Sequence, residues 1–174
     1  MDEFRRMFKT NKHLNNINQF SNFDKALKKR DIEKNTILMY VVRESTMEMF
    51  DLFVSKITEA PDEQNIYGET ALHIAICRGN LHLIEELLKL KINVNLQNRE
   101  GHTAVNYAIM YNDVLNLRCV LSQSAYFIDN IDSYIDQARK ENKKEMVTLL
   151  VEYKKNFDWY NLPNAKLNEI AIKF

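Results

Sequence analysis

The sequence predicts an all-α solenoid of about four stacked helix-turn-helix units, with β-hairpin-type loops between units and irregular caps at both ends. Three observations lead to this fold class. A pattern that begins at Gly68 recurs at Gly101, each copy has the apolar spacing of two short helices, and the 174 residues include only three glycines and two prolines. Sheet proteins use glycine and proline in their many turns, so the scarcity of both favours helices.

The repeat is clearest in the two copies that begin at Gly68 and Gly101. At this offset the copies share threonine, alanine and aliphatic positions, in the pairs Thr70/Thr103, Ala71/Ala104, Leu72/Val105, Ala75/Ala108, Ile76/Ile109 and Leu88/Leu121. Weaker copies precede and follow them. One unit cannot bury both of its helices, whereas stacked units bury a continuous core, and for this reason such units occur in arrays.

The expected organisation is four repeats between two terminal segments. The repeats span about residues 35–64, 65–97, 98–130 and 131–155. Residues 1–34 are expected to form an N-terminal cap or a degenerate repeat, and residues 156–174 a C-terminal capping segment. Within these ends, "FDKALKKRDIEKNT" (23–36) is compatible with a helix, and Leu167, Ile170 and Phe174 have the spacing of one helical face.

In the repeat at 65–97, each element has a local signal. Thr70 is a suitable N-cap for a short helix that runs to about Cys77. Gly79 suits the left-handed position that ends such a helix. The second helix is expected to bury one stripe at spacings of three and four, formed by Leu81, Ile84, Leu87 and Leu88. The following "KINVNLQNREG" is polar and alternating, and indicates an extended loop with a tight turn.

Charge and composition narrow the class of partner. The net charge is zero, but residues 1–34 carry +4 (nine basic, five acidic), residues 35–138 carry −7 (seven basic, fourteen acidic) and residues 139–174 carry +3 (eight basic, five acidic). An acidic middle repels phosphate backbones and attracts basic protein surfaces, so no nucleic-acid partner is expected. The basic runs "KALKKRD" and "RKENKKE" carry acidic residues at helical spacing and are interpreted as solvated faces.

The sequence also indicates where the chain acts. No apolar run is long enough to cross a bilayer, and "MDEFRRMFKTNKHL" lacks the apolar region of a signal peptide. Two cysteines without a secretory signal indicate reduced thiols. We therefore expect a monomer in the cytoplasm, or also in the nucleus, with no membrane partner.

His73 and Cys77 are the pair that suggests a catalytic site, since they stand four residues apart on one helical face. They suit a base and a nucleophile, but no orienting residue or oxyanion-hole pattern stands near them. Metal-ligand spacings such as Cys-x-x-Cys and phosphate-binding glycine loops are absent from the sequence. We therefore expect no enzyme activity, no metal site and no cofactor; loss of an activity in a stable Cys77→Ala variant would revive the catalytic alternative.

The repeat resembles the ankyrin repeat. Its G-x-T-P-L-H-x-A pattern is matched at Gly68, Thr70, Leu72, His73 and Ala75, with Ala71 where proline is usual. The next copy has Val105 and Asn106 where Leu-His is usual. The resemblance implies that His73 is structural, bonding near the motif threonine and supporting the neighbouring hairpin.

The resemblance also implies a partner-binding surface on the concave side, where hairpin tips and exposed residues of the first helices lie. Carried over by position, this surface consists of Ile66, Tyr67, Glu69, Cys77, Arg78, Gln97, Arg99, Glu100, His102, Met110 and Tyr111. Ile66 and Tyr67, with Met110 and Tyr111 nearby, are expected to form an apolar patch. Tyrosine, methionine and arginine are enriched at the centres of interfaces.

Residues 101–134 are similar to a middle repeat of the IκB proteins, the ankyrin inhibitors of NF-κB/Rel transcription factors. The likeness includes the G-x-T-x-x-x-x-A start and the helix end at "VLSQS" (120–124). It implies an inhibitor that occludes a Rel-homology partner. The sequence contains no Asp-Ser-Gly phosphodegron. Short IκB-like proteins of this kind occur in large DNA viruses, which would place the chain in a host cell.

The alternative is a substrate adaptor that recruits a target to a ubiquitin ligase or another host complex. The tail begins with Leu162-Pro163 and continues with spaced aliphatic residues, loosely like a recruiting box. Deleting residues 156–174 separates the alternatives: loss of folding indicates a cap, and loss of one partner from a folded chain indicates a recruiting motif.

Overall fold

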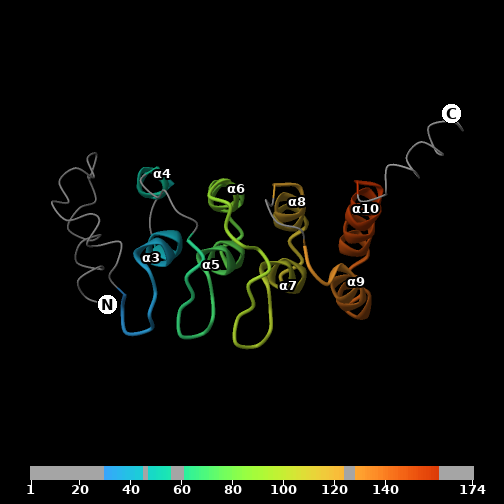
Figure 1. Ribbon diagram of the computed structural model, residues 1–174, viewed down its shortest axis with the longest axis horizontal. Coiled ribbons are helices and arrows are strands. Elements are labelled where there is room, and N and C mark those ends of the chain that lie inside the picture. Colours follow the sequence, from blue (N-terminus) through green and yellow to red (C-terminus); the bar gives the residue numbers. More distant parts are fainter. Residues whose placement is uncertain (1–29, 45–46, 56–60, 124–127, 161–174) are drawn as a thin grey trace, which may run out of the picture. The chain divides into compact units, whose positions relative to one another are not determined.

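The computed structural model describes residues 30–44, 47–55, 61–123 and 128–160 (Figure 1). Within these ranges the chain forms eight helices and no strand, which confirms the predicted all-α class. One isolated β-bridge joins Arg30 to Thr36. The helices are α3 (Ile37–Glu44), α4 (Met47–Val54), α5 (Ala71–Cys77), α6 (Leu81–Lys89), α7 (Ala104–Met110), α8 (Val114–Gln123), α9 (Ile131–Lys140) and α10 (Lys144–Tyr160).

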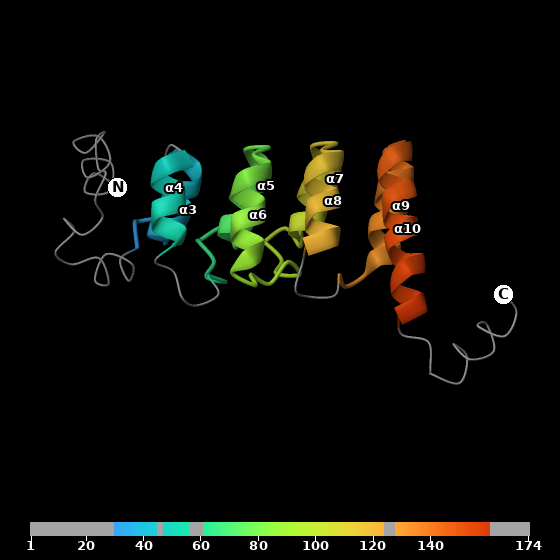
Figure 2. The ribbon, with the colours of Figure 1, turned by 90° about the horizontal axis from the view of Figure 1, so that it is seen from above.

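The chain divides into two compact units, Met1–Asp129 and Asn130–Phe174. In the first unit the helices form two layers. The inner helices α3, α5 and α7 pack side by side, the outer helices α4, α6 and α8 form a second row, and each inner helix contacts the outer helix that follows it (Figures 1 and 2). Loops precede α5 and α7 on the side of the inner row (Figure 1). This arrangement is the stacked helix-turn-helix array that the repeat predicts.

The core of the first unit lies between the two layers. Its largest fully buried side chains are Ile37, Met39, Phe50, Phe53, Leu72, Ile76, Leu83, Ile84, Leu87, Ile92, Ile109 and Leu117. They come from all the helices described in this unit and from the loop after α6. Burying one such side chain stabilises the folded state by about 1.5–3 kcal/mol, so each repeat depends on its neighbours for most of its stability.

The ends of α5 follow the sequence prediction. Thr70 is the N-cap, with an extended backbone and a side chain that accepts from the His73 amide, and Arg78 is the C-cap. Gly79 has a left-handed φ of +62°, as its position after the helix requires. Asn80 then caps α6 by accepting from the Leu83 amide at 3.3 Å.

The predicted stripe of α6 was wrong at one position. Leu83, Ile84, Leu87 and Leu88 are buried, whereas Leu81 is exposed. Leu81 is the first residue of the helix, directly after the N-cap. Helical side chains point toward the N-terminus of their helix, so the side chain of a first residue projects past the packed turns.

The second unit contains the helix pair α9 and α10, which pack against each other. The apolar side chains buried on these two helices are Ile131, Tyr134, Ile135, Ala138, Met146, Leu149 and Leu150. On its surface the Lys154 ammonium lies 2.6 Å from the Asp132 carboxylate. The helix α10 continues to Tyr160, past the residue at which the sequence pattern of the fourth repeat ends.

Some predictions fall outside the described residues. These are the N-terminal segment up to residue 29, the capping face of Leu167, Ile170 and Phe174, and the recruiting-box likeness at Leu162-Pro163. The possible helix over 23–36 is described only from Arg30, and from there to Thr36 it is a loop closed by the β-bridge. No helix in the described ranges has the length and apolarity needed to cross a membrane.

Candidate functional site

The loops before α5 and α7 are hairpins built around one asparagine each. The Oδ1 atom of Asn65 accepts from the amides of Tyr67 and Glu69, both at 2.9 Å. Oδ1 of Asn98 accepts in the same way from the amides two and four residues later, again at 2.9 Å. An Asx side chain that binds its own following backbone sets a tight turn. The turn residues between the bonds are therefore held in one conformation.

Sequence reasoning missed this feature, although its signal was present. Asn65 and Asn98 stand one repeat period apart, and Asp31 precedes Asn65 by nearly the same interval. The Asp31 carboxylate accepts from the amides of Glu33 and Asn35 at 2.9 and 2.8 Å. The same turn therefore precedes α3, where Lys34 takes the positive φ that glycine has in the later copies.

Successive hairpins are joined by backbone hydrogen bonds. The amide of Ile66 donates to the carbonyl of Glu33 at 2.8 Å, and the amide of Arg99 donates to the carbonyl of Tyr67 at 2.9 Å. The close approach explains Gly68, which has a φ of +76°. A Cβ atom there would stand 2.8 Å from the backbone nitrogen of Arg99. Only glycine satisfies both the conformation and the contact.

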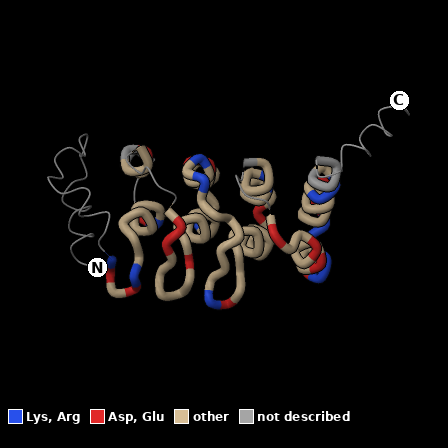
Figure 3. The backbone as a smooth tube through the Cα atoms, in the orientation of Figure 1, with Lys and Arg blue, Asp and Glu red and all other residues tan. Residues whose placement is uncertain are grey.

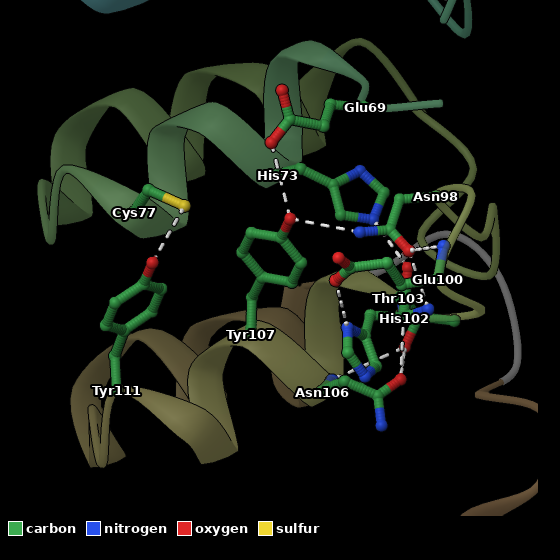
Figure 4. A network of polar contacts seen from close by, with 10 residues as sticks. All are labelled: Glu69, His73, Cys77, Asn98, Glu100, His102, Thr103, Asn106, Tyr107 and Tyr111. Carbon is green, nitrogen blue, oxygen red and sulfur yellow. Dashed lines mark hydrogen bonds and ion pairs between the residues drawn. The ribbon is translucent and has the colours of Figure 1, made fainter. Parts of the chain in front are cut away.

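His73 connects α5 to the following hairpin (Figure 4). Its Nδ1 atom accepts from the Thr70 amide at 3.1 Å and lies 2.8 Å from the Thr70 hydroxyl. Because an amide only donates, Nδ1 is unprotonated, and Nε2 carries the proton that it donates to the His102 carbonyl at 3.1 Å. Burial lowers the pKa of His73 and favours this neutral form. The predicted local bond to threonine and support of the next hairpin are both present.

Tyr107 extends this network between repeats (Figure 4). Its hydroxyl accepts from Asn98 Nδ2 at 3.1 Å and donates to Glu69 Oε1 at 3.3 Å. Its ring meets the His73 ring edge-on, with centroids 5.2 Å apart. Burial is the main cause that raises the pKa of Tyr107 to about 12. Sequence reasoning did not single out Tyr107, because an aromatic residue at this position of a helix is also compatible with simple packing.

Cys77 pairs with a tyrosine and not with His73. Its sulfur lies 3.6 Å from the Tyr111 hydroxyl, across to the next inner helix. Burial raises the pKa of the Cys77 thiol, which keeps it protonated and disfavours a nucleophilic thiolate. Both ring nitrogens of His73 bind other groups, so histidine and cysteine are not arranged as base and nucleophile. Within the described residues no three side chains are grouped as a metal site would require.

A family model of three ankyrin repeat copies matches residues 7–98 and again residues 38–132. The chain belongs to the ankyrin repeat family. The ankyrin fold is a non-catalytic scaffold that mediates protein–protein interaction, and the chain is a module of that class. The structural role of His73 agrees with what the family resemblance implied.

Known proteins support the family at the level of fold. The chain is similar to FPV031 of fowlpox virus (strain NVSL), named as an ankyrin repeat protein, with 25% identity over 132 residues, 71% of this chain and 39% of that one. The chain thus spans well under half of this relative. An ankyrin repeat domain of Acinetobacter baumannii AYE superposes with a TM-score of 0.62, at 23% identity, over 74% of this chain and 69% of that chain.

A second solved structure is the ankyrin repeat domain of Bcl-3, described as a unique member of the IkappaB protein family. It superposes with a TM-score of 0.66 at 21% identity, over 78% of this chain and 63% of that chain. At this identity the likeness establishes the ankyrin fold.

The structure divides the sequence-predicted binding residues of the ankyrin array into two groups. One, the hairpin group, lies before the N-termini of α5 and α7 and consists of Ile66, Tyr67, Glu69, Gln97, Arg99, Glu100 and His102. The other, the turn group, lies at the C-termini of these helices and consists of Cys77, Arg78, Met110 and Tyr111. Contacts between His73 and His102 at one end, and between Cys77 and Tyr111 at the other, show that α5 and α7 run in the same direction.

The expected apolar patch of Ile66, Tyr67, Met110 and Tyr111 stays a prediction, and its members are spread over both ends of the inner helices. Tyr67 precedes α5, whereas Met110 ends α7, so the two lie at opposite ends of parallel inner helices. Ile66 is only partly exposed. The repeat positions of these residues were visible in the sequence, but the length of helix that separates hairpin from turn was not taken into account.

Several predicted residues also have internal roles. Glu69 and His102 are half-buried; Glu69 binds Tyr107, and the Nδ1 atom of His102 lies 3.3 Å from Glu100 Oε2. The Arg78 guanidinium donates to the Val42 carbonyl at 2.5 Å and so ties α5 to the end of α3. The members that present large exposed apolar side chains are Tyr67, Met110 and Tyr111.

Proposed function

We propose that this ankyrin array acts by binding a protein partner over the hairpin and turn groups, without chemistry of its own. The observation that carries the proposal is exposure: Tyr67 is 50% exposed, Met110 47% and Tyr111 57%. Three of the six large hydrophobic side chains exposed among the described residues thus belong to the predicted set. Single exposed apolar residues are ordinary, but tyrosine and methionine together are typical of interface centres.

The scaffold beneath these residues supports tight binding. His73 and Tyr107 link the hairpin at 98–102 to α5 and α7, and the backbone bond between hairpins fixes Tyr67 beside Arg99. A surface held by hydrogen bonds before binding loses less conformational entropy when the partner arrives. We therefore interpret the network in Figure 4 as preorganisation of the interface.

We further propose that the partner is a Rel-homology transcription factor and that binding occludes its functional surface. Three observations support this choice. Residues 35–138 carry a net charge of −7, which favours a partner with basic nuclear-import and DNA-contact surfaces. Residues 101–134 resemble an IκB repeat. Bcl-3, an IkappaB family member, shares the fold, and FPV031 is a viral relative.

The test is a titration of the full chain with a purified Rel-homology domain at low and physiological ionic strength. We expect saturable binding whose Kd rises with salt, and a further rise of about tenfold for Tyr67→Ala. Ser122→Ala, an exposed change on the outer helix α8 that leaves the net charge unaltered, is the matched control and should leave Kd unchanged. A folded chain that shows no binding to the Rel-homology domain would exclude this partner.

A further inference from the structure

The fold leaves the hydroxyl of Tyr67 open. The side chain is 50% exposed, and its hydroxyl makes no hydrogen bond within the described residues. The Tyr111 hydroxyl, by comparison, contacts the Cys77 sulfur at 3.6 Å, and the Tyr107 hydroxyl donates to Glu69 at 3.3 Å. An enzyme that modifies tyrosine could therefore reach the Tyr67 oxygen without breaking a side-chain contact.

The turn around Tyr67 is held through its backbone. The Tyr67 amide donates to Asn65 Oδ1 at 2.9 Å, and the Tyr67 carbonyl accepts from the Arg99 amide at 2.9 Å. Residues 61–65, just before the turn, belong to neither a helix nor a strand. Figure 1 shows the loop before α5 extending away from the helices. The phenol is thus presented from a projecting loop whose side-chain tip has no role in the turn.

The sequence around Tyr67 is acidic. Residues 57–77 contain four Asp or Glu and no Lys or Arg. Asp62 and Glu63 precede Tyr67 by five and four residues, and Glu69 follows it by two. Figure 3 shows acidic residues on the loop before α5. Kinases select their substrates partly by charge pattern, and an acidic segment suits a kinase with a basic substrate groove.

The two carboxylates before Tyr67 also contact neighbouring loops. Asp62 Oδ1 accepts from the Asn93 amide at 2.7 Å. Glu63 pairs with Arg30 of the loop before α3, and its side chain remains 55% exposed. Glu63 is therefore the acidic residue of this segment that is most open to a second protein, and its charge is shared with one arginine.

Arg99 offers a counter-charge for a phosphoryl group on Tyr67. Its amide binds the Tyr67 carbonyl, its side chain is exposed, and it forms no ion pair with a described residue. A phosphotyrosine carries about −1.5 to −2 charges and three acceptor oxygens at neutral pH. A guanidinium binds such a group with paired, charge-assisted hydrogen bonds. The neighbouring hairpin thus balances part of the charge that modification would add beside Glu69.

We propose that Tyr67 is a phosphorylation site for a tyrosine kinase that prefers acidic substrates. In the transfer the phenol oxygen bonds to the γ-phosphorus of ATP, the bond from that phosphorus to the β,γ-bridging oxygen breaks, and ADP leaves. The phenol proton passes to the carboxylate base of the kinase. Because Tyr67 also belongs to the hairpin group, phosphorylation would replace an apolar anchor of the proposed binding surface with an anion.

The test incubates the folded full chain with Mg²⁺, ATP and the purified catalytic domain of a tyrosine kinase that prefers acidic substrates. Mass spectrometry of digests then locates the phosphate over time. We expect Tyr67 to be modified at an initial rate at least about tenfold above that of Tyr111. Tyr111 is the internal control, since it is 57% exposed but no Asp or Glu stands among residues 101–112.

Variants check the acceptor and the charge pattern. Tyr67→Phe removes a hydroxyl that makes no bond in the described fold, so the chain should fold and lose most of the incorporated phosphate. Glu63→Gln should lower the rate at Tyr67 about threefold, whereas Glu145→Gln, the same charge change at an exposed position of α10, should not.

Four results would each overturn the phosphorylation proposal. They are no incorporation into the folded chain, incorporation chiefly at another tyrosine, undiminished incorporation in Tyr67→Phe, and equal rates for the two glutamine variants. The assay contains no binding partner, so its failure is distinct from a failure of the Rel-homology proposal.

Discussion

His73 joins two ankyrin repeats through its two ring nitrogens. Nδ1 accepts from Thr70 at the start of α5, and Nε2 donates to the His102 carbonyl of the next hairpin at 3.1 Å. Capping of one helix and support of the following loop therefore depend on one side chain in one protonation state. Through this link the position of the hairpin group depends on the helix before it.

Replacing His73 with asparagine is expected to destabilise the fold by about 1–2 kcal/mol, because the His102 carbonyl keeps the Asn98 amide but loses its second donor. The chain itself indicates that asparagine keeps the helix cap. At the equivalent position of α7, Asn106 Oδ1 accepts from the Thr103 amide at 2.8 Å. His73→Ala should cost about 1 kcal/mol more, because it also removes the cap. Urea unfolding measures both, and equal stability of all three proteins would contradict the assigned role.

The stability of the wild type should fall with pH below about 6.5, the ordinary pKa of histidine. Because burial lowers the pKa of His73 in the fold, the unfolded chain binds a proton first. The stabilisation is fully present above that pH and is lost as the pH falls through the folded-state pKa. In this pH range the free energy of unfolding should change with pH more steeply for the wild type than for His73→Asn, by up to about 1.4 kcal/mol per pH unit. Identical slopes in denaturant titrations across this range would refute the assignment.

Gly68→Ala should destabilise the protein more than Gly101→Ala. Both residues have positive φ, +76° and +82°, so each substitution costs roughly 1 kcal/mol of backbone strain. Only at Gly68 would the new Cβ approach the neighbouring hairpin, whereas at Gly101 no atom lies within 4 Å. Thermal unfolding of the two variants side by side is the measurement, and equal losses would show that the hairpins do not approach as closely as described.

Tyr107→Phe should destabilise the fold by about 1 kcal/mol or more, because it removes hydrogen bonds to Asn98 and Glu69 in a part-buried network. Tyr111→Phe, one turn later on the same helix face, is the matched control. It removes only a weak contact to the Cys77 sulfur and should change stability little. If Tyr111→Phe proved the more costly change, the Tyr107 hydrogen bonds drawn in Figure 4 would not be the main link between the repeats.

The helix ends were predictable because their signals are local. Three local signals are sufficient to place α5 and the equivalent helix of the next repeat, α7. They are Thr70, Gly79 and the interval between Gly68 and Gly101. Leu81 shows the limit of such reasoning. The spacing of Leu81 fits the buried stripe. A first helical residue nevertheless projects beyond the packed turns of its helix. The periodicity of the sequence does not show how far along the helix the packing against neighbouring helices extends.

The candidate site was only partly predictable because it depends on contacts between repeats. The positions of Glu69 and Tyr111 in the family repeat predict that both lie on the binding surface. Glu69, however, accepts a hydrogen bond from the Tyr107 hydroxyl of the next repeat, 38 residues away. Tyr107 itself carries no distinguishing sequence signal. The division of the predicted surface into hairpin and turn groups follows from the length of the inner helices and from their shared direction, and the shared direction appears only when the repeats are stacked.

The most direct test of the central claim is the Kd of a protein partner, recovered by affinity capture on the full chain, for the wild type and for Tyr67→Ala/Tyr111→Ala. Each tyrosine is expected to contribute about tenfold, so the double variant should bind about a hundredfold more weakly while its circular dichroism and unfolding midpoint stay near wild type. An unchanged Kd for the folded double variant would contradict the proposal that the hairpin and turn groups form the binding surface.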